Sequence, residues 1–493
     1  MPVTSPGSTA ERRISADMLR PAVDPPRTPV AERAARIRFR RALSLMAMTL
    51  VAPGSAQLAA GNRRVGRIAL RLWLVLLVVG AISLVVLALD PHVGLSLALA
   101  PRFLLALRLL LILGALGWAA LLIDAWRLGQ PLTLGLAHRR AVVGVNGVLT
   151  FTVAGALLFG AHVVGVQRDF ILTMFGSGQA SGAHDGRYNV LLLGGDSGAG
   201  RWGLRPDSMT VASVDAATGR TVLISLPRNM QNFPFVKGSV MRQQFPQGFD
   251  ADYLNGVNTW ALDNTELFPK SDHPGIDATI QAIEGITGLR INYWAMVNLQ
   301  GFKDLVNAVG GITLNVRQPI PIGGLGDDVT GYVPAGVHRL TGTQALWYAR
   351  AREGSDDYSR MARQKCVMNA MLHQISPQTA LTNFEKIMQA STELISTNLP
   401  ASELDTFIPL AMKARDQKIA TLSLVPPMID TAHPDIPLIH RKVSEAIARA
   451  EGTAMAPASK PAKVKDDVVT GGSIGSLRTG YAANEAEDLG AAC

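Results

Sequence analysis

Residues 188–215 read YNVLLLGGDSGAGRWGLRPDSMTVASVD, and this stretch decides the fold class of the C-terminal part of the chain. Tyr188–Leu193 is a continuous apolar run, and Gly194 and Gly195 end it. A short apolar run with a glycine break is typical of a strand buried on both faces. Ser208–Val214 is the next predicted strand.

The residues after this stretch continue the pattern. Thr221–Ser225 is a third predicted strand, and a turn at residues 217–219 separates it from the second. Asp277–Thr287 and Leu299–Val309 show the apolar spacing of amphipathic helices. Because strands and helices alternate, we expect an α/β sandwich with a central mixed β-sheet over residues 185–450.

Three long apolar stretches precede this domain. They predict transmembrane helices at residues 68–89, 103–123 and 141–166, since about 20 apolar residues cross a bilayer. An earlier apolar run within residues 42–60 is short and contains Pro53-Gly54. We expect that segment to be interfacial or re-entrant.

The whole chain of 493 residues has a net charge of +9, and its location matters more than its size. The first 71 residues carry this entire excess, because the remainder has equal numbers of basic and acidic residues. Arg63, Arg64 and Arg67 precede the first predicted span and Arg71 lies near its start, while Arg127, Arg139 and Arg140 lie between the second and third. Positive residues stay on the cytoplasmic side. We therefore expect a multi-pass protein of the cell membrane with a cytoplasmic N-terminus and an extracytoplasmic C-terminal domain, and no binding to nucleic acid.

The two ends of the chain have biased compositions. Residues 1–41 are rich in Arg, Pro and Ala, which predicts a basic, disordered cytoplasmic arm. Residues 452–484 are rich in Ala, Pro, Lys, Gly and Ser, which predicts a linker to a short tail at 485–493.

Two local patterns suggest chemistry that the rest of the chain does not support. Gly195-Asp196-Ser197-Gly198 is similar to the nucleophile loop of trypsin-like proteases, but that reaction needs a His and an Asp from an upstream β-barrel. The run GGDSGAG is similar to a phosphate loop, but it lacks the Gly-Lys-Ser/Thr ending.

A third pattern is more informative, since it combines aspartates with arginines near the ends of predicted strands. Carboxylates at adjacent strand ends can hold a hard cation such as Mg²⁺, and arginine forks suit phosphate oxygens. Scattered surface salt bridges are the alternative. The pattern consists of Asp196, Arg205, Asp207, Arg228, Arg350, Arg352, Arg360, Arg363 and Gln364.

The segments that carry these residues resemble the successive motifs of the LytR–CpsA–Psr family. In chain order the matching segments are NVLLLGGDS, RPDSMTVASVD, TVLISLPRN, LNGVNTWA, YWAMVNLQGFKDLVNAVGGITLNV, HRLTGTQALWYARAR and DDYSRMARQ, across about residues 188–372. The resemblance implies a membrane-anchored, Mg²⁺-dependent phosphotransferase of cell-wall biogenesis, with Mn²⁺ as an alternative ion. Such an enzyme transfers a glycopolymer from a polyprenyl pyrophosphate carrier to a peptidoglycan hydroxyl.

The resemblance also implies roles for single residues. Asp196 and Asp207 resemble the metal-coordinating aspartates, and Asp207 is our candidate general base. The pyrophosphate-binding residues are implied to be Arg205, Arg228, Arg350, Arg352, Arg360, Arg363 and Gln364, and Arg228, Arg350 and Arg352 are also implied in catalysis. The lipid is expected in an apolar pocket inside the α/β core, and the candidate lining helices lie near Ile276–Ile286 and Phe302–Val309. Ordinary core packing is the alternative for any one of these residues.

One position departs from the family pattern, which usually reads Pro-Arg-Asp where this chain has Pro227-Arg228-Asn229. If that Asp only orients Arg228, hydrogen bonding by Asn could suffice; if its charge is needed, activity is lost. Two alternatives therefore stay open, a non-catalytic binder of lipid-linked glycan and a pyrophosphate hydrolase. We find no DNA-reading element that would support a transcriptional regulator.

The chain has two cysteines, Cys366 and the C-terminal Cys493. Both lie on the expected extracytoplasmic side, where disulfides form. We predict a Cys366–Cys493 disulfide that ties the tail to the domain; two unrelated thiols are the alternative.

Overall fold

The computed structural model describes residues 29–89, 91–175, 180–195, 205–324, 327–352, 356–375, 395–452 and 482–493. The chain comprises two compact units. One unit comprises Met1–Leu84 and Arg108–His162, and the other comprises Val85–Leu107 and Val163–Cys493.

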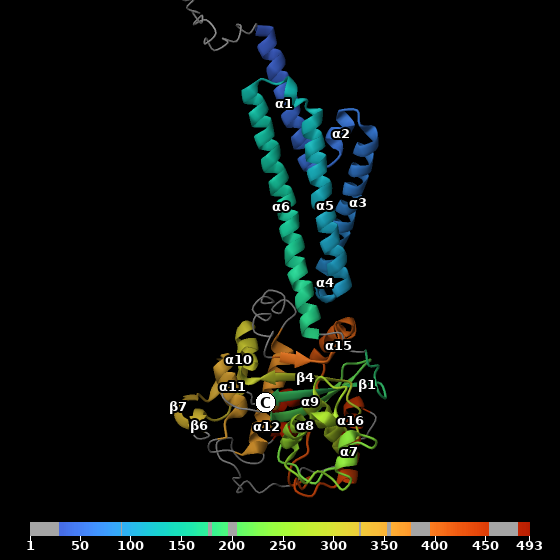
Figure 1. The fold of residues 1–493 in the computed structure, drawn as a ribbon. Helices are drawn as coiled ribbons and strands as arrows, with labels where there is room; N and C mark the ends of the chain where they lie inside the picture. Colours follow the sequence, from blue (N-terminus) through green and yellow to red (C-terminus); the bar gives the residue numbers. More distant parts are fainter. Residues whose placement is uncertain are drawn as a thin grey trace, which may run out of the picture. The chain divides into compact units, whose positions relative to one another are not determined.

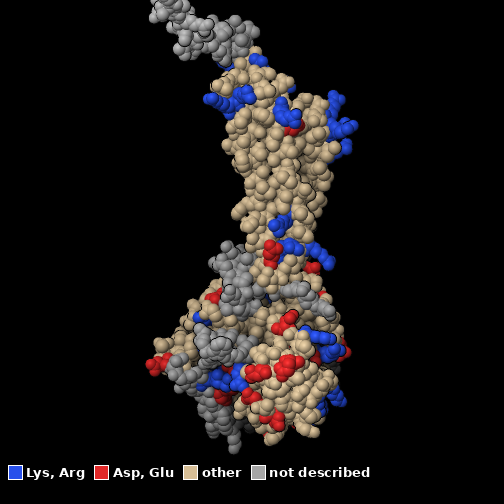
Figure 2. Space-filling model, viewed as in Figure 1, with Lys and Arg blue, Asp and Glu red and all other residues tan. Residues whose placement is uncertain are grey.

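The N-terminal residues form helices. These are α1 (Pro29–Val51), α2 (Ser55–Ala59), α3 (Arg63–Leu89), α4 (Pro91–Leu99), α5 (Pro101–Leu128) and α6 (Leu136–Phe175), with a 3₁₀ turn, η2, at Pro131–Thr133. Three segments are long and apolar enough to cross a membrane, Arg63–Leu89, Pro101–Thr133 and Leu136–Thr173, and they contain the three predicted spans. Figure 2 shows no Lys, Arg, Asp or Glu along the middle of these helices on the visible face. The chain is anchored in a membrane by helices of this kind.

The predicted disorder of residues 1–41 is wrong for residues 29–41, because they form the first half of α1. The second half of α1 packs Ala42 and Met46 against Val142 of α6, and this contact stabilises the helix. Residues 1–28 lie outside the described residues. The segment 42–60 is helical in α1 and α2, and its interfacial location stays a prediction.

A seven-stranded mixed sheet forms the core of the C-terminal unit, in the order β11-β10-β3-β2-β1-β4-β9. β1 pairs antiparallel with β2 and parallel with β4, while β3 pairs antiparallel with β2 and parallel with β10. The expected α/β class with a mixed sheet is confirmed. The strands are β1 (Arg187–Gly195), β2 (Pro206–Asp215), β3 (Thr221–Leu226), β4 (Tyr293–Asn298), β9 (Ile395–Thr397), β10 (Ile419–Ser423) and β11 (Glu485–Ala486).

Helices cover both faces of this sheet (Figure 1). On one face, Leu191, Leu193 and Val211 share a buried cluster with Ile283 of α9 and Val443 of α16. Alternate residues point to the opposite face, where the strands contribute Leu223 and Ala212 to a second cluster with α11 and α12. The period of two along each strand therefore separates two packing layers.

The remaining elements complete these layers. The helices are α7 (Val240–Gln244), α8 (Val257–Asp263), α9 (Pro274–Thr287), α10 (Leu299–Ala308), α11 (Gly342–Arg350), α12 (Asp357–Gln374), α15 (Leu404–Arg415) and α16 (Ile436–Glu451), with 3₁₀ turns η3 (Leu254–Gly256), η4 (Thr265–Leu267) and η5 (Ala401–Glu403). Two small antiparallel pairs join β5 (Ile312–Val316) to β8 (Gly336–Leu340) and β6 (Ile320–Gly324) to β7 (Asp327–Val333).

The C-terminal tail belongs to the domain. Within it, η6 (Ala482–Asn484) leads to β11, which pairs with β10 at the sheet edge, and α18 (Leu489–Ala492) follows. Cys493 is joined to Cys366 of α12 by a disulfide, which is the predicted pair. The domain thus extends beyond the predicted limit of 450, and residues 482–484 of the predicted linker are ordered on its core. Residues 453–481 lie outside the described residues.

Candidate functional site

Three strand ends meet at one end of the sheet. β2 runs antiparallel to its neighbours β1 and β3, so its first residues lie beside the last residues of both. Gly195 of β1 pairs with Pro206, and Leu226 of β3 pairs with Met209. Residues that begin β2 or follow β3 are therefore placed together by the hydrogen-bond register.

Asp207 and Arg228 occupy these positions and form an ion pair. Arg228 donates from Nη1 to Oδ1 of Asp207 at 2.7 Å, and both side chains are about one-fifth exposed. A charge-assisted hydrogen bond of this length is strong in a partly desolvated setting. The two predicted site residues are thus joined at the end of the sheet.

Helices α11 and α12 bring further arginines to the same place. α11 begins with a capping box between Thr341 and Gln344 and ends at Arg350. α12 begins at an Asp356 cap, whose side chain accepts a hydrogen bond from the backbone N–H of Ser359. Two well-defined helix boundaries therefore position Arg350 and Arg352 before α12 and Arg360 on its first turn.

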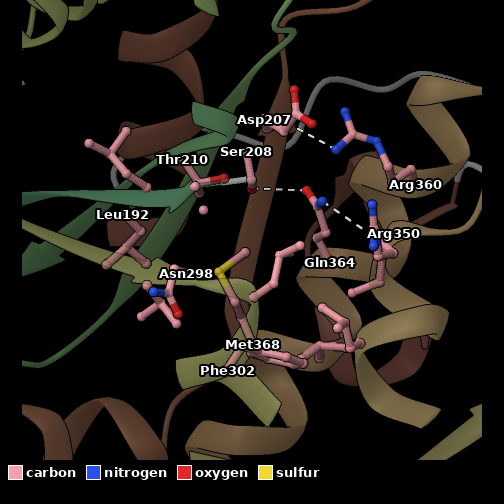
Figure 3. A pocket seen from close by; sticks show the side chains of 18 of the residues that line it. Leu192, Asp207, Ser208, Thr210, Asn298, Phe302, Arg350, Arg360, Gln364 and Met368 are labelled. Atoms are coloured by element: carbon pink, nitrogen blue, oxygen red, sulfur yellow. Dashed lines mark hydrogen bonds between the residues drawn. The ribbon is translucent and has the colours of Figure 1, made fainter. Parts of the chain in front are cut away.

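A cavity of about 260 Å³ opens beside these residues (Figure 3). Its polar end includes Asp207, Arg350, Arg352, Arg360 and Gln364. Its other walls are apolar and come from β1, β4, α10 and α12, including Leu192, Ala295, Val297, Phe302, Met368 and Met371. The cavity therefore joins a strongly cationic end to an apolar interior.

Hydrogen bonds fix the side chains at the polar end. Ser208 donates its hydroxyl to Oε1 of Gln364 at 2.9 Å, and Arg360 donates from Nη1 to the backbone oxygen of Asp207 at 3.0 Å. Figure 3 shows Asp207, Ser208, Arg360 and Gln364 turned toward one another. Both contacts connect α12 to β2 across the mouth of the cavity.

A second carboxylate, Asp357, lies among the arginines. Its Oδ2 accepts a hydrogen bond from Nε of Arg228 at 2.9 Å, and its Oδ1 is 3.6 Å from Nε of Arg352 and from Nε of Arg360. Among the described residues, Nε of Arg352 and of Arg360 has no hydrogen-bond partner. Three guanidinium groups thus converge on two carboxylates, which leaves an excess of positive charge suited to an anion.

The charges shift one another's pKa values. Burial raises the pKa of Asp357, but Arg360, Arg228 and Arg352 outweigh it and hold the pKa below its ordinary value. Burial lowers the pKa of Arg228, and its two carboxylate partners raise it above the ordinary value. Burial dominates at Arg360 and lowers its pKa. Asp357 is therefore a stable anion at neutral pH.

Asn229, the departure from the family pattern, does not hold Arg228. Arg228 has carboxylate partners at positions 207 and 357, and Oδ1 of Asn229 has no hydrogen-bond partner within the described residues. The orientation of Arg228 therefore does not require an acidic residue at position 229.

Arg363 does not line the cavity in the described structure, whereas Arg360 and Gln364 do, so its implied contact with pyrophosphate stays a prediction. Its buried Nη2 donates to the backbone oxygen of Ala351. Successive helix residues turn by about 100°, so Gln364 lies about 40° from Arg360 on one side and Arg363 about 60° on the other. Arg363 instead fixes the backbone between Arg350 and Arg352.

Two other predicted residues have different outcomes. Arg205 is about half exposed and pairs with Asp252 in the described structure, outside the cavity lining. Asp196 lies outside the described residues.

The guanidinium carbon of Arg350 lies 5.0 Å from the centre of the Trp347 ring, a cation–π contact at the end of α11.

Of the two helices expected around an apolar pocket, α10 lines the cavity and α9 does not, and a lipid as the occupant stays a prediction. Phe302 and Leu305 line the cavity, whereas Ile276, Ile283 and Ile286 are buried in the core cluster on the other face of the sheet. Both helices are amphipathic, and sequence does not tell which face of a sheet a helix will cover.

The described residues contain no cluster of three His, Cys, Asp or Glu that could hold a metal ion by themselves. Asp207 supplies one carboxylate at the cavity, and its Oδ1 already accepts from Arg228. Mg²⁺ is commonly held by one or two carboxylates with substrate phosphates and water. Binding of Mg²⁺ at Asp207 therefore stays a prediction.

Two functional residues were not singled out from the sequence. Asp357 precedes Arg360 by three residues, and an acid and a base at that spacing on one helix signal an ion pair. Ser208 carries no comparable signal, because its bond to Gln364 joins residues 156 positions apart.

With this site in place, the chain can be compared with known proteins. Residues 168–432 match the LytR_cpsA_psr family. The match covers more than half of the chain, and the protein belongs to this family.

Several curated relatives are similar over the same region. Biofilm regulatory protein A of Streptococcus mutans is 29% identical over 235 residues, which is 46% of this chain and 53% of that protein. The polyisoprenyl-teichoic acid–peptidoglycan teichoic acid transferase TagU of Oceanobacillus iheyensis is 28% identical over 239 residues, which is 48% of this chain and 66% of TagU. The chain thus spans between half and two thirds of the length of these relatives.

Solved structures are also similar. Protein gbs0355 of Streptococcus agalactiae matches with a TM-score of 0.41 and 23% identity, over 53% of this chain and 88% of that chain. TagV of B. subtilis matches with a TM-score of 0.40 and 22% identity, over 55% of this chain and all of that chain.

Proposed function

We propose that this protein transfers a glycopolymer from a polyprenyl pyrophosphate carrier to a hydroxyl of peptidoglycan and forms a phosphodiester link. The observation that carries the proposal is the two-ended cavity, with arginines at one end and apolar walls at the other. A pyrophosphate attached to a prenyl chain has the same two-part chemistry. The transferase name of the TagU relatives supports the same reaction class.

The arginines bind and orient the pyrophosphate in this mechanism. Arg228, Arg352 and Arg360 offset charge that develops as the bond between the two phosphates breaks. The acceptor hydroxyl attacks the phosphorus that carries the glycan, and the polyprenyl phosphate leaves with the electrons of the broken P–O bond. Arg350 and Gln364 line the same end of the cavity and hold the head group from the α11 and α12 side.

Asp207 is the proposed general base. Its Oδ1 is engaged by Arg228 at 2.7 Å, while Oδ2 is 3.9 Å from the nearest nitrogen of Arg352 and can accept the proton of the attacking hydroxyl. Mg²⁺ or Mn²⁺, held by Asp207 and Asp196 as the family resemblance implies, would neutralise phosphate charge when bound.

We also propose the membrane orientation that the arginines predict. Arg63, Arg64 and Arg67 begin α3, and Arg139 and Arg140 lie on the first turn of α6, so these ends would be cytoplasmic. The domain with the cavity would then be extracytoplasmic, where peptidoglycan is assembled. Protease treatment of intact spheroplasts should cleave the C-terminal domain; protection of that domain would refute this orientation.

The test of function uses the full chain in lipid nanodiscs with a polyprenyl pyrophosphate glycan, divalent cation and peptidoglycan fragments. The proposal predicts glycopolymer attached to peptidoglycan and released polyprenyl phosphate. Released phosphoglycan without attachment would show a hydrolase instead. Tight binding without turnover would show a non-catalytic binder.

A further inference from the structure

Asp357 and Asp207 hold the same three arginines from opposite ends. At one end, Nε of Arg228 lies 2.9 Å from Asp357, and Nε of Arg352 and of Arg360 each lie 3.6 Å from it. Each of the three arginines therefore presents the inner nitrogen of its guanidinium to one carboxylate.

The terminal nitrogens of the same arginines point to Asp207. Arg228 Nη1 is 2.7 Å from Oδ1 of Asp207, Arg352 Nη2 is 3.9 Å from Oδ2, and Arg360 Nη1 is 3.0 Å from the backbone oxygen. Asp207, Arg352 and Arg360 line the cavity, whereas Arg228 and Asp357 are not among the lining residues of the described structure. Asp357 thus contacts the two cavity-lining arginines from outside the lining, and Arg228 links it to Asp207.

We propose that Asp357 is a positioning residue, which binds Arg228 by a hydrogen bond and attracts Arg352 and Arg360 by charge, so that the arginines keep a spacing that matches a pyrophosphate. This inference rests on the proposed function and deepens it, because it assigns the selection of a double phosphate to a residue that does not touch the ligand.

The physical reason is the mutual repulsion of the arginines. Three guanidinium groups that share one site repel one another and, without a common anion, would separate into different rotamers. Arg360 is almost fully buried, with 4% of its side chain exposed, so solvent screens it weakly. Asp357 begins α12, where the helix dipole also favours an anion. A single anion at this point therefore keeps the spacing of three cations.

A fixed spacing should matter more for pyrophosphate than for orthophosphate. Pyrophosphate is bound by several forks at once, so a change in their relative positions weakens its binding, whereas one fork still binds orthophosphate. Replacement of Asp357 by Asn keeps the size of the side chain and removes its charge. The expected result is a loss of discrimination between the two anions.

The experiment measures calorimetric binding of inorganic pyrophosphate and of orthophosphate to the full chain in detergent. We expect Asp357→Asn to lower the preference for pyrophosphate by about tenfold or more, since small displacements of binding groups cause losses of this size. Asp357→Glu, which restores the charge with a longer reach, should recover part of the preference. Asp263→Asn, the same change at an exposed position of α8, should leave the preference unaltered.

The outcomes separate the inference from the proposed function. If wild type binds pyrophosphate selectively and Asp357→Asn does so equally, the positioning role is wrong and the proposed function stands. If Asp357→Asn loses both anions in the same proportion and melts at a lower temperature, its role is structural, which also overturns the inference. If Asp357→Asn does not fold, Asp357→Glu decides, because undiminished selectivity at a displaced carboxylate would contradict the required geometry. A wild type without preference for pyrophosphate would refute the proposed function itself.

Discussion

The two faces of the central sheet differ in how closely side chains pack against them. One face is filled, with Leu191 and Leu193 of β1 buried against Ile283 of α9. The other face is hollow beside Leu192, where Ala295 and Val297 line a cavity under α10 and α12. Neighbouring residues of one strand thus pack a filled core on one side and border a cavity on the other.

The difference follows from the side chains that each face receives. The filled face is closed by large apolar groups from α9 and α16, whereas the cavity is bordered by Ala295 and Val297 of β4 and, at its polar end, by Arg360 of α12. A cavity that is apolar along its walls and cationic at one end is a poor core and a good site for an amphipathic anion. The comparison predicts that changes on the two faces will affect different properties.

The largest effect is expected at the polar end of the hollow face. Arg228→Ala removes the arginine that binds both carboxylates, and transfer should fall about 100- to 1,000-fold, as expected for the loss of an electrostatic stabiliser. Steady-state transfer rates in nanodiscs measure this. Arg441→Ala on the exposed side of α16 is the control and should retain full activity. Undiminished transfer by Arg228→Ala would remove that residue from the mechanism.

A matched pair on β1 tests the two faces directly. Leu191→Ala deletes a fully buried side chain and should lower the free energy of unfolding by about 3 kcal/mol. Leu192→Ala makes the same change one residue away. Because Leu192 already borders a cavity and loses fewer contacts, this change should lower the free energy of unfolding by roughly half as much. Urea unfolding followed by fluorescence measures both, and equal losses would show that the second face is packed like the first.

A buried lysine on α12 gives the hollow side a pH-dependent stability. Lys365 is fully buried and donates hydrogen bonds to Ser423 and to Asn484, and burial lowers its pKa to about 7. Between about pH 7 and the unfolded value of 10.5, the unfolded chain binds more protons, so stability rises with pH in this window. From pH 7 to pH 9 the gain should approach about 2 kcal/mol.

Lys365→Met should remove this dependence. The free energy of unfolding is measured for wild type and for Lys365→Met at pH 7, 8 and 9. The value for wild type minus the value for the variant gives the contribution of Lys365 at each pH. A difference that stays constant across the three values would show that Lys365 keeps its ordinary pKa in the folded protein.

The smallest effect is expected from partial filling of the cavity. Ala295→Leu adds apolar volume to the wall contributed by β4 and should weaken binding of farnesyl pyrophosphate about tenfold, or about 1.4 kcal/mol. Binding of inorganic pyrophosphate should not change, because the arginines lie at the other end. If both ligands lose affinity equally, the apolar walls are not a lipid site.

Much of this arrangement was predictable from local sequence. The first three strands follow from apolar runs bounded by glycine, proline and turn residues, and their order places Asp207 beside Arg228 once the pairing is antiparallel. The Cys366–Cys493 pair follows from the sequence having only two cysteines, both after the last predicted span. These features depend on neighbours in the chain or on simple counting.

The features that sequence reasoning missed depend on tertiary packing. Residues 29–41 look like a charged arm, yet they are the first half of a helix whose second half packs on α6. Arg363 follows Arg360 by three residues on the same helix, but its side chain is buried and donates a hydrogen bond to the backbone oxygen of Ala351. Which of α9 and α10 lines the cavity depends on which face each helix covers.

Competition between farnesyl pyrophosphate and inorganic pyrophosphate tests the central claim, that the hollow face is one site with a cationic end and an apolar end. The measurement is calorimetric titration of the full chain with each ligand alone and with farnesyl pyrophosphate in the presence of saturating pyrophosphate. We predict that the two compete for a single site and that farnesyl pyrophosphate binds about tenfold more tightly or better, because burial of its isoprene carbons adds to the same phosphate contacts. Simultaneous binding of both ligands, or equal affinities, would contradict the account.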